Sequence, residues 1–181
     1  MNYKLDRLSK IGIVFLTICF VGACAGTNSR YAKQCPAKPG SDIHLNMSVD
    51  IPLNTARVYS QNGRIVAKSD IDRNEVFCSV LMNRLQKKDG PKLSVLPGKF
   101  RVTQVKISND ENYASRIFAS KDWVYDPPSN VNYETELRLQ SEDQLEVRSL
   151  ICVRQIDGYG NHYPKLNDFK DTLGALVEFS E

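Results

Sequence analysis

Hydrophobic and polar residues alternate through much of the second half of the chain. In the segment 133–140, Tyr, Thr and Leu at odd positions alternate with charged and amide residues at even positions. This period of two predicts a strand with one face toward the core. After a polar turn at 141–144, the odd positions from Leu145 to Val153 share one face, while Leu150 and Cys152 populate the other. The second strand is therefore expected to start half exposed and to become covered on both faces.

Two short segments predict turns between strands. Asn62-Gly63 is the strongest hairpin signal in the chain, and it joins a strand over 56–61 to a strand over 64–69. Pro97-Gly98 predicts a type II turn between strands at 92–95 and 100–107, since Pro presets φ and Gly accepts a positive φ.

The segment 74–88 fits two patterns. Its apolar residues (Val76, Phe77, Val80, Leu81 and Leu85) match a helical stripe that follows a capping box at 72–75. The same residues also alternate as in a strand from Val76 to Met82. We favour the strand, because a disulfide from Cys78 is easily made between neighbouring strands.

The C-terminal segment predicts the one helix of the folded domain. Asn167 is expected to cap a helix over 168–173, in which Leu166, Phe169 and Leu173 form an apolar stripe. Gly174 ends it, and a last strand follows at 175–179. The predicted fold is mainly β: a small antiparallel β-sandwich or barrel with one short C-terminal helix.

The N-terminus carries a different hydrophobic pattern. Positively charged residues (Lys4, Arg7 and Lys10) precede an apolar run over 11–21. A helix of about 11 residues is too short for a hydrocarbon core of about 30 Å. The pattern is instead typical of a secretory signal peptide.

This run ends in Val21-Gly22-Ala23-Cys24, which resembles the lipobox of bacterial lipoproteins. The resemblance implies that the signal peptide, residues 1–23, is removed and that Cys24 becomes the acylated N-terminus, carrying diacylglycerol and palmitate. An aspartate after the cysteine holds many lipoproteins at the inner membrane. Ala25 at this position therefore implies the periplasmic face of the outer membrane, if the host is Gram-negative.

Residues 24–42 follow as the lipidated cysteine and a polar, Pro- and Gly-rich tether. A single β-rich globular domain is expected over 43–181. Composition is ordinary, with 41% hydrophobic and 25% charged residues in 181. The formal charge of +3 falls to near +1 without residues 1–23, so a nucleic-acid partner is not indicated.

Five cysteines are present, and two are assigned by the lipoprotein resemblance: Cys19 leaves with the signal peptide and Cys24 is lipidated. An exported chain enters an oxidising compartment, where disulfides are expected. Cys78 and Cys152 both lie in apolar, strand-like runs, so we predict a disulfide between them. Cys35 in the tether is then left over. The alternative is that Cys78 and Cys152 are two buried thiols.

No pattern of catalytic, metal-binding or cofactor-binding residues stands out, so no enzyme activity and no cofactor are predicted. His44 and His162 are the only histidines, and no Cys/His spacing suits a zinc site. Aromatic residues gather between 113 and 133, and Trp123, Tyr125 and Tyr113 could form a partner surface. The alternative, which we favour, is that Trp123 and Tyr125 plug the end of the β-domain.

These observations predict a non-catalytic lipoprotein, anchored in the outer membrane, that binds an envelope protein or a cell-wall component. A subunit of a secretion or assembly complex is one such role. Two alternatives remain at this point. One is a small envelope hydrolase using carboxylates or His162. The other is a lysozyme-inhibitor-like protein, which would need an acidic face.

Overall fold

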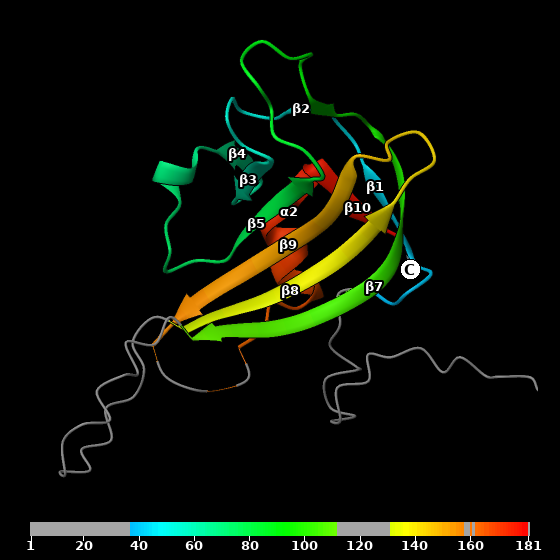
Figure 1. Ribbon diagram of the computed structural model, residues 1–181. Helices are drawn as coiled ribbons and strands as arrows, with labels where there is room; N and C mark the ends of the chain where they lie inside the picture. The colour runs from blue at the N-terminus through cyan, green and yellow to red at the C-terminus, as the bar shows by residue number, and fades with distance from the viewer. Residues whose placement is uncertain (1–36, 112–130, 158–159, 161, 181) are drawn as a thin grey trace, which may run out of the picture.

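The computed structural model describes residues 37–111, 131–157, 160 and 162–180 (Figure 1). The strands are β1 (Asp42–Leu45), β2 (Val49–Asp50), β3 (Arg57–Gln61), β4 (Arg64–Val66), β5 (Phe77–Met82), β6 (Ser94–Val95), β7 (Gly98–Glu111), β8 (Val131–Gln140), β9 (Val147–Ile156) and β10 (Val177–Phe179). The helices are α2 (Leu166–Leu173) and two 3-10 turns, η1 (Lys68–Asp70) and η2 (Gly174–Leu176).

Eight strands form one curled antiparallel sheet in the order β10-β1-β7-β8-β9-β5-β3-β4. Strands β2 and β6 pair with each other beside it. Helix α2 packs against one side of the sheet, behind β8 and β9 in the view of Figure 1. The prediction of a mainly β fold with one short C-terminal helix is therefore confirmed, with the sheet closed only as far as a half-barrel.

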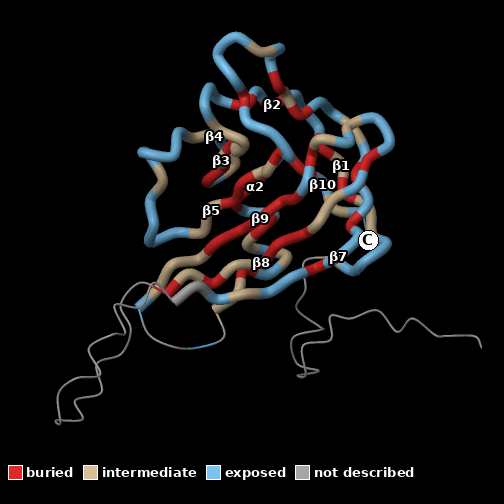
Figure 2. Tube along the Cα trace, in the orientation of Figure 1, coloured by how far each residue is buried: buried red, intermediate tan, exposed pale blue. Residues whose placement is uncertain are grey.

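The core lies between α2 and the inner face of this sheet, which is the face turned toward the helix. Phe169 and Leu173 of α2 and Leu176 of η2 bury their side chains against the sheet residues of the core. The ring of Phe169 meets that of Phe179 at 6.0 Å, edge to face. Buried residues follow the central strands β8, β9 and β5 in Figure 2.

The predicted disulfide is present in this core. Cys78 on β5 lies directly opposite Cys152 on β9, and their Cα atoms are 4.0 Å apart. Both side chains are fully buried. The strand prediction for 76–82 is confirmed by the same pairing, because β5 spans Phe77–Met82 between β9 and β3. The alternative prediction, a helix over 74–88, is therefore wrong.

The prediction that all odd positions from Leu145 to Val153 share one face is wrong, because β9 contains a β-bulge. Leu81 pairs with Ser149, and the next residue, Met82, pairs with Val147, so Arg148 is the extra residue of β9. The bulge turns Val147 toward the core with Met82, whereas Ser149 stays on the opposite face. Leu145 is not in the strand at all and is 75% exposed.

Two turn predictions have different outcomes. Asn62 and Gly63 adopt φ of 52° and 72° between β3 and β4, as a type I′ hairpin requires. The type II turn at Pro97-Gly98 is wrong. Gly98 lacks a positive φ and starts β7, and the preceding strand β6 pairs with β2 rather than with β7.

Helix α2 begins earlier than expected, at Leu166, and Asn167 is not its cap. The carboxylate of Asp168 instead accepts a hydrogen bond from the backbone N–H of Lys165 at 2.7 Å. Asp168 also pairs with Arg154 of β9 at 2.5 Å, which ties the start of the helix to the sheet. Gly174 ends the helix as predicted, with φ of 54°.

Candidate functional surface

The face of the sheet turned away from α2, here called the outer face, is a regular surface that no described helix covers. Directly paired residues of antiparallel strands point to the same side of a sheet. Since Cys78 and Cys152 point to the core, their neighbours along the strands point outward. The outer face thus carries, from β7 to β3, one row of Lys106, Glu136, Ile151, Ser79 and Tyr59 and a second row of Gln104, Arg138, Ser149, Leu81 and Arg57.

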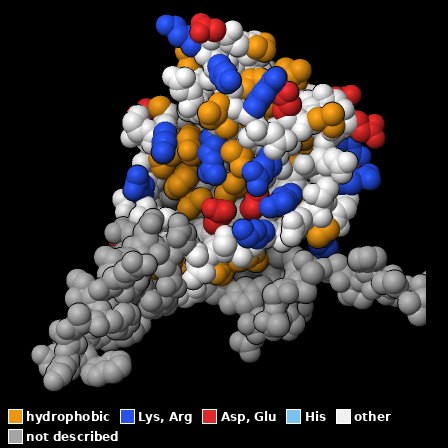
Figure 3. Space-filling view, viewed as in Figure 1, with side chains coloured by type: hydrophobic (Ala, Val, Ile, Leu, Met, Phe, Trp, Pro, Cys, Tyr) orange, Lys and Arg blue, Asp and Glu red, His pale blue; other side chains and the backbone are white. Residues whose placement is uncertain are grey.

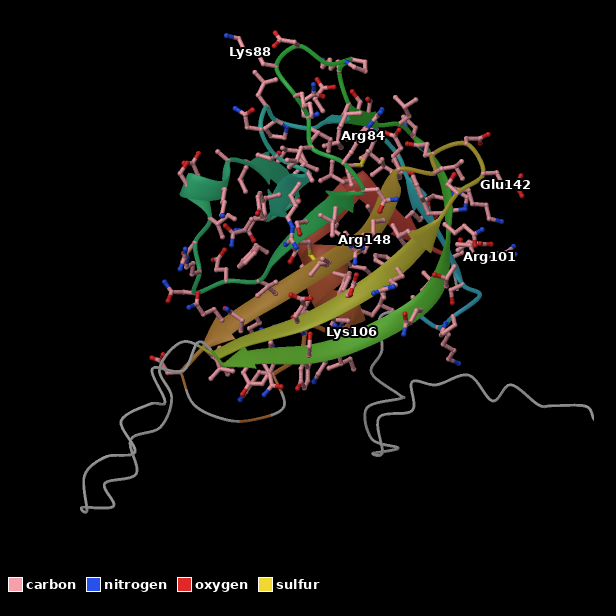
Figure 4. All side chains as sticks on the ribbon, viewed as in Figure 1. Arg84, Lys88, Arg101, Lys106, Glu142 and Arg148 are labelled. Carbon is pink, nitrogen blue, oxygen red and sulfur yellow. A yellow bond between two sulfur atoms is a disulfide. The ribbon has the colours of Figure 1, made fainter. Side chains whose placement is uncertain are left out.

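The bulge in β9 adds Arg148 to this face. Without the bulge, strict alternation would place Arg148 on the same side as Leu150, inside the core. In Figure 4 the labelled side chain of Arg148 lies in front of β9, on the side of the sheet opposite to α2. Arg148 is exposed. The bulge therefore places a positively charged side chain on the outer face, over β9.

Hydrophobic side chains form a strip on this face over β3, β5 and β9. Tyr59, Phe77 and Leu81 are each half-buried, and the rings of Tyr59 and Phe77 lie 6.4 Å apart. Ile151 beside them is only 3% exposed, although it points away from the core. Figure 3 shows this face, on which hydrophobic groups lie next to Lys and Arg side chains.

The charged side chains of the outer face are mostly cationic, although Glu134 and Glu136 also lie on it. Arg57, Lys106 and Arg148 form no ion pair with any described residue. Glu136 is only 6% exposed, and its carboxylate lies 3.8 Å from Nε of Arg138. The surface therefore combines aromatic and aliphatic area with guanidinium groups, which is the composition of the energetically dominant residues in protein interfaces.

The centre of this face also holds an unsatisfied hydroxyl. Ser149 pairs directly with Arg138 across β8 and β9. Its Oγ is fully buried and has no hydrogen-bond partner among the described residues. Most buried polar side-chain atoms in folded proteins do find a partner, so Ser149 marks a place where the sheet by itself leaves a polar group unpaired.

The predicted candidates for chemistry do not come together in the described part of the chain. His44 is on β1, opposite Lys99 and Glu178. The ring of His162 lies 5.4 Å from that of Tyr133, whose hydroxyl oxygen accepts a hydrogen bond from the backbone N–H of Gly160. No group of three or more metal-ligating side chains occurs among the described residues.

An apolar hollow lies between the helix and the sheet, lined by residues such as Val58, Ile65 and Leu176. Its volume is about 20 Å³. A water molecule needs roughly 10–15 Å³ measured in this way, so the hollow has room for one water and not for an organic ligand.

Several predicted site residues fall outside the described part of the chain. These are the lipidated Cys24, the leftover Cys35 and the aromatic residues Tyr113, Trp123 and Tyr125. Their roles stay predictions. Of the predicted sites, the Cys78–Cys152 bond is the one that the structure confirms. That bond also occupies the sulfur of Cys152, which is therefore no free nucleophile.

Sequence reasoning missed the outer face as a surface. The polar phase of 133–140 placed Arg138 and Glu136 on it, but the contributions of β3 and β5 depend on their pairing with β9. Arg148 depends on the bulge. No local pattern around positions 57, 77 or 148 signals that these side chains are neighbours.

Comparisons with known protein families, with curated proteins and with solved structures find no match to this chain. Within the described ranges, no helix has both the length and the apolar character needed to cross a bilayer.

Proposed function

We propose that this protein is an exported lipoprotein whose β-domain serves as a non-catalytic binding module in the cell envelope. The anchor is Cys24, at the end of the lipobox-like Val21-Gly22-Ala23-Cys24. The first strand of the domain begins at Asp42, so residues 25–41 separate the anchor from the sheet. With Ala25 after the cysteine, the proposed location is the periplasmic face of the outer membrane.

The observation that carries the binding role is the outer face of the sheet. Half-buried Tyr59, Phe77 and Leu81 lie beside Arg57 and Arg148, which have no ion-pair partner among the described residues. Aromatic and arginine side chains contribute most of the affinity in many interfaces, because both combine apolar area with directed polar groups.

The partner that fits this face best is another envelope protein that presents aliphatic groups and carboxylates. Carboxylates would pair with the guanidinium groups of Arg57 and Arg148, in bidentate geometry where the approach allows. A surface of this sign does not suit a basic target such as lysozyme, for which an inhibitor needs an acidic face.

The anchor is tested by metabolic labelling with radioactive palmitate. The full chain is expected to incorporate the label and to fractionate with membranes, whereas Cys24→Ser incorporates none and leaves the membrane fraction. Cys35→Ser is the matched control and should behave as the wild type. An unlabelled wild-type protein would refute the lipoprotein assignment.

The binding face is tested in intact cells with a photo-crosslinking amino acid placed at position 148. Position 170 on α2 is the control, because Lys170 is exposed on an element that covers the opposite face of the sheet. A discrete protein adduct is expected from position 148 and not from position 170. The adduct should be lost on the charge reversal Arg57→Glu and retained with Lys170→Glu. Equal adducts from both positions would exclude the outer face as the binding surface.

A further inference from the structure

Exposed hydrophobic side chains gather at one end of the sheet, here called the loop end. It consists of the connections 46–48, 51–56, 83–93, 96–97 and 141–146, at the upper end of the molecule in Figure 1. Seven large hydrophobic side chains are markedly exposed in the described residues, and five of them belong to these connections: Met47, Leu53, Leu85, Leu96 and Leu145. Their exposed fractions run from 45% to 75%.

Backbone and side-chain hydrogen bonds join four of these five connections into one surface. The backbone N–H of Asn54 donates to the carbonyl of Gln86 at 2.8 Å, which joins the segment of Leu53 to that of Leu85. The amide of Asn83 donates to the carbonyl of Leu145 at 3.2 Å. The side chain of Gln144 then bonds both the N–H and the carbonyl of Leu96, at 2.7 and 2.9 Å. The four leucines therefore lie on neighbouring, mutually fixed loops.

Charges of opposite sign lie on the two sides of this surface. Lys87 and Lys88 belong to the loop that follows β5, and Glu142 and Asp143 belong to the turn between β8 and β9. All four side chains are exposed, and none has a hydrogen-bond or ion-pair partner among the described residues. Figure 4 shows Lys88 and Glu142 well apart at this end, with Arg84 between them. Arg84 pairs with Glu146 at 2.8 Å and so adds no free charge.

We propose that the loop end is a two-fold contact with a second copy of this chain. A two-fold axis through the leucines would set the basic loop of each copy against the acidic turn of the other. The exposed leucines would be buried at the centre, and the four charges of each copy would form the rim. The proposal concerns a different surface from the outer face and requires neither the lipid anchor nor the proposed partner.

The charge distribution favours a second copy over an anionic lipid surface. The charged side chains of the loop end comprise four cations (Arg84, Lys87, Lys88 and Lys92) and four carboxylates (Asp89, Glu142, Asp143 and Glu146). A surface that binds anionic lipid needs an excess of cations. This end has none. Lys87 and Lys88, with Asp89 beside them, lie on one side, and Glu142 and Asp143 lie on the other, so the two sides differ in net sign as a self-complementary contact requires.

The test uses the full chain, co-expressed as two differently tagged copies, solubilised in detergent and captured through one tag. One charge-reversed chain carries Lys87→Glu and Lys88→Glu, and the other carries Glu142→Lys and Asp143→Lys. Each is expected to lose at least roughly tenfold in capture of its own kind, because like charges then face each other; tenfold corresponds to about 1.4 kcal/mol. Capture should return when the two variants are combined, and also when all four changes are made in one chain.

The rescue keeps the test independent of folding, since only a folded partner can restore capture. Leu145→Glu should abolish capture in every combination, whereas Lys170→Glu on α2 should leave it unchanged. Undiminished self-capture by either charge-reversed chain would overturn the proposal, and so would failure of the mixed pair to associate. Association that requires an intact membrane would also overturn it, because the copies would then share only the bilayer.

Discussion

Gly63 and Gly174, which are 111 residues apart in the chain, touch through their backbones. A Cβ added to Gly174 would lie 3.0 Å from the Cα of Gly63. The N–H of Gly63 also donates to the carbonyl of Thr172 at 3.0 Å, near the end of α2. The turn of the β3–β4 hairpin thus rests directly on the helix terminus, and this contact closes one side of the core.

This contact predicts that Gly174→Ala destabilises the protein more than Gly63→Ala. At Gly174 the φ of 54° and ψ of −131° are nearly restricted to glycine, and a Cβ would press on backbone. We expect a loss of about 1–3 kcal/mol from strain, with the steric contact adding to it. At Gly63 a Cβ would have an ordinary 3.7 Å contact, so only the left-handed φ opposes it, at about 1 kcal/mol.

Urea denaturation of the two variants measures the difference in the free energy of unfolding. Gly90→Ala is the matched control. Its φ is not in the left-handed region and its nearest contact would be 3.5 Å, so its stability should change by less than about 0.5 kcal/mol. If Gly174→Ala proved as mild as this control, the hairpin and the helix would not be packed as described.

Removal of the disulfide is expected to cost more than any single surface change. The bond joins residues separated by 74 positions, and the chain-entropy model assigns a loop of that length about 4 kcal/mol. Cys78→Ala with Cys152→Ala should therefore lower the melting temperature strongly. Adding a reductant to the wild type should lower it as well, while Cys35→Ala should leave it unchanged. Free thiols at both positions in non-reducing mass mapping would contradict this prediction.

Asp42 links stability to pH at the start of β1. The hydrogen bond from Lys99 at 2.7 Å, together with nearby Arg101, holds the pKa of Asp42 below its ordinary value of 3.8. Because the pKa is lower in the folded state, the stabilising pair is complete above pH 3.8 and is lost as the pH falls through the folded-state value. Asp42→Asn should thus lower the melting temperature at pH 7 and converge with the wild type in strong acid.

The control for this comparison is Asp89→Asn, since Asp89 is exposed and has no ion-pair partner among the described residues. It should change the melting temperature little at either pH. Added salt should shrink the effect at Asp42, because both pairs are partly exposed and are screened. A constant difference between Asp42→Asn and the wild type down to the most acidic pH would show that the carboxylate charge is not responsible.

Local sequence patterns predicted most of the individual elements. The alternation over 133–140 gives β8, Asn62-Gly63 gives the first hairpin, and Gly174 gives the end of α2. These signals succeed because each depends on residues close together in the chain: side-chain period, a left-handed φ, a helix terminus. The Cys78–Cys152 bond could also be predicted from the sequence, since both cysteines lie in apolar strand-like runs.

The misses arise where a distant segment decides the outcome. The bulge at Arg148 appears only in the pairing of β9 with β5, and it moves Val147 into the core. Strand β6 pairs with β2 and does not form a hairpin with β7. No residue in the turn between β6 and β7 indicates this pairing. The cap of α2 comes from Asp168, whose carboxylate is also held by Arg154 across the core.

The sequence by itself determined that this is a mainly β domain with one C-terminal helix and a buried disulfide, because side-chain period and local backbone preference are properties of short segments. It also carries the lipobox-like motif on which the proposed anchor depends. Only the tertiary structure decided which side chains share a surface. Register across β7, β8, β9, β5 and β3 assembles the outer face, and the meeting of five connections assembles the loop end. Such neighbours are brought together by strand pairing over long separations, which no single stretch of the chain records.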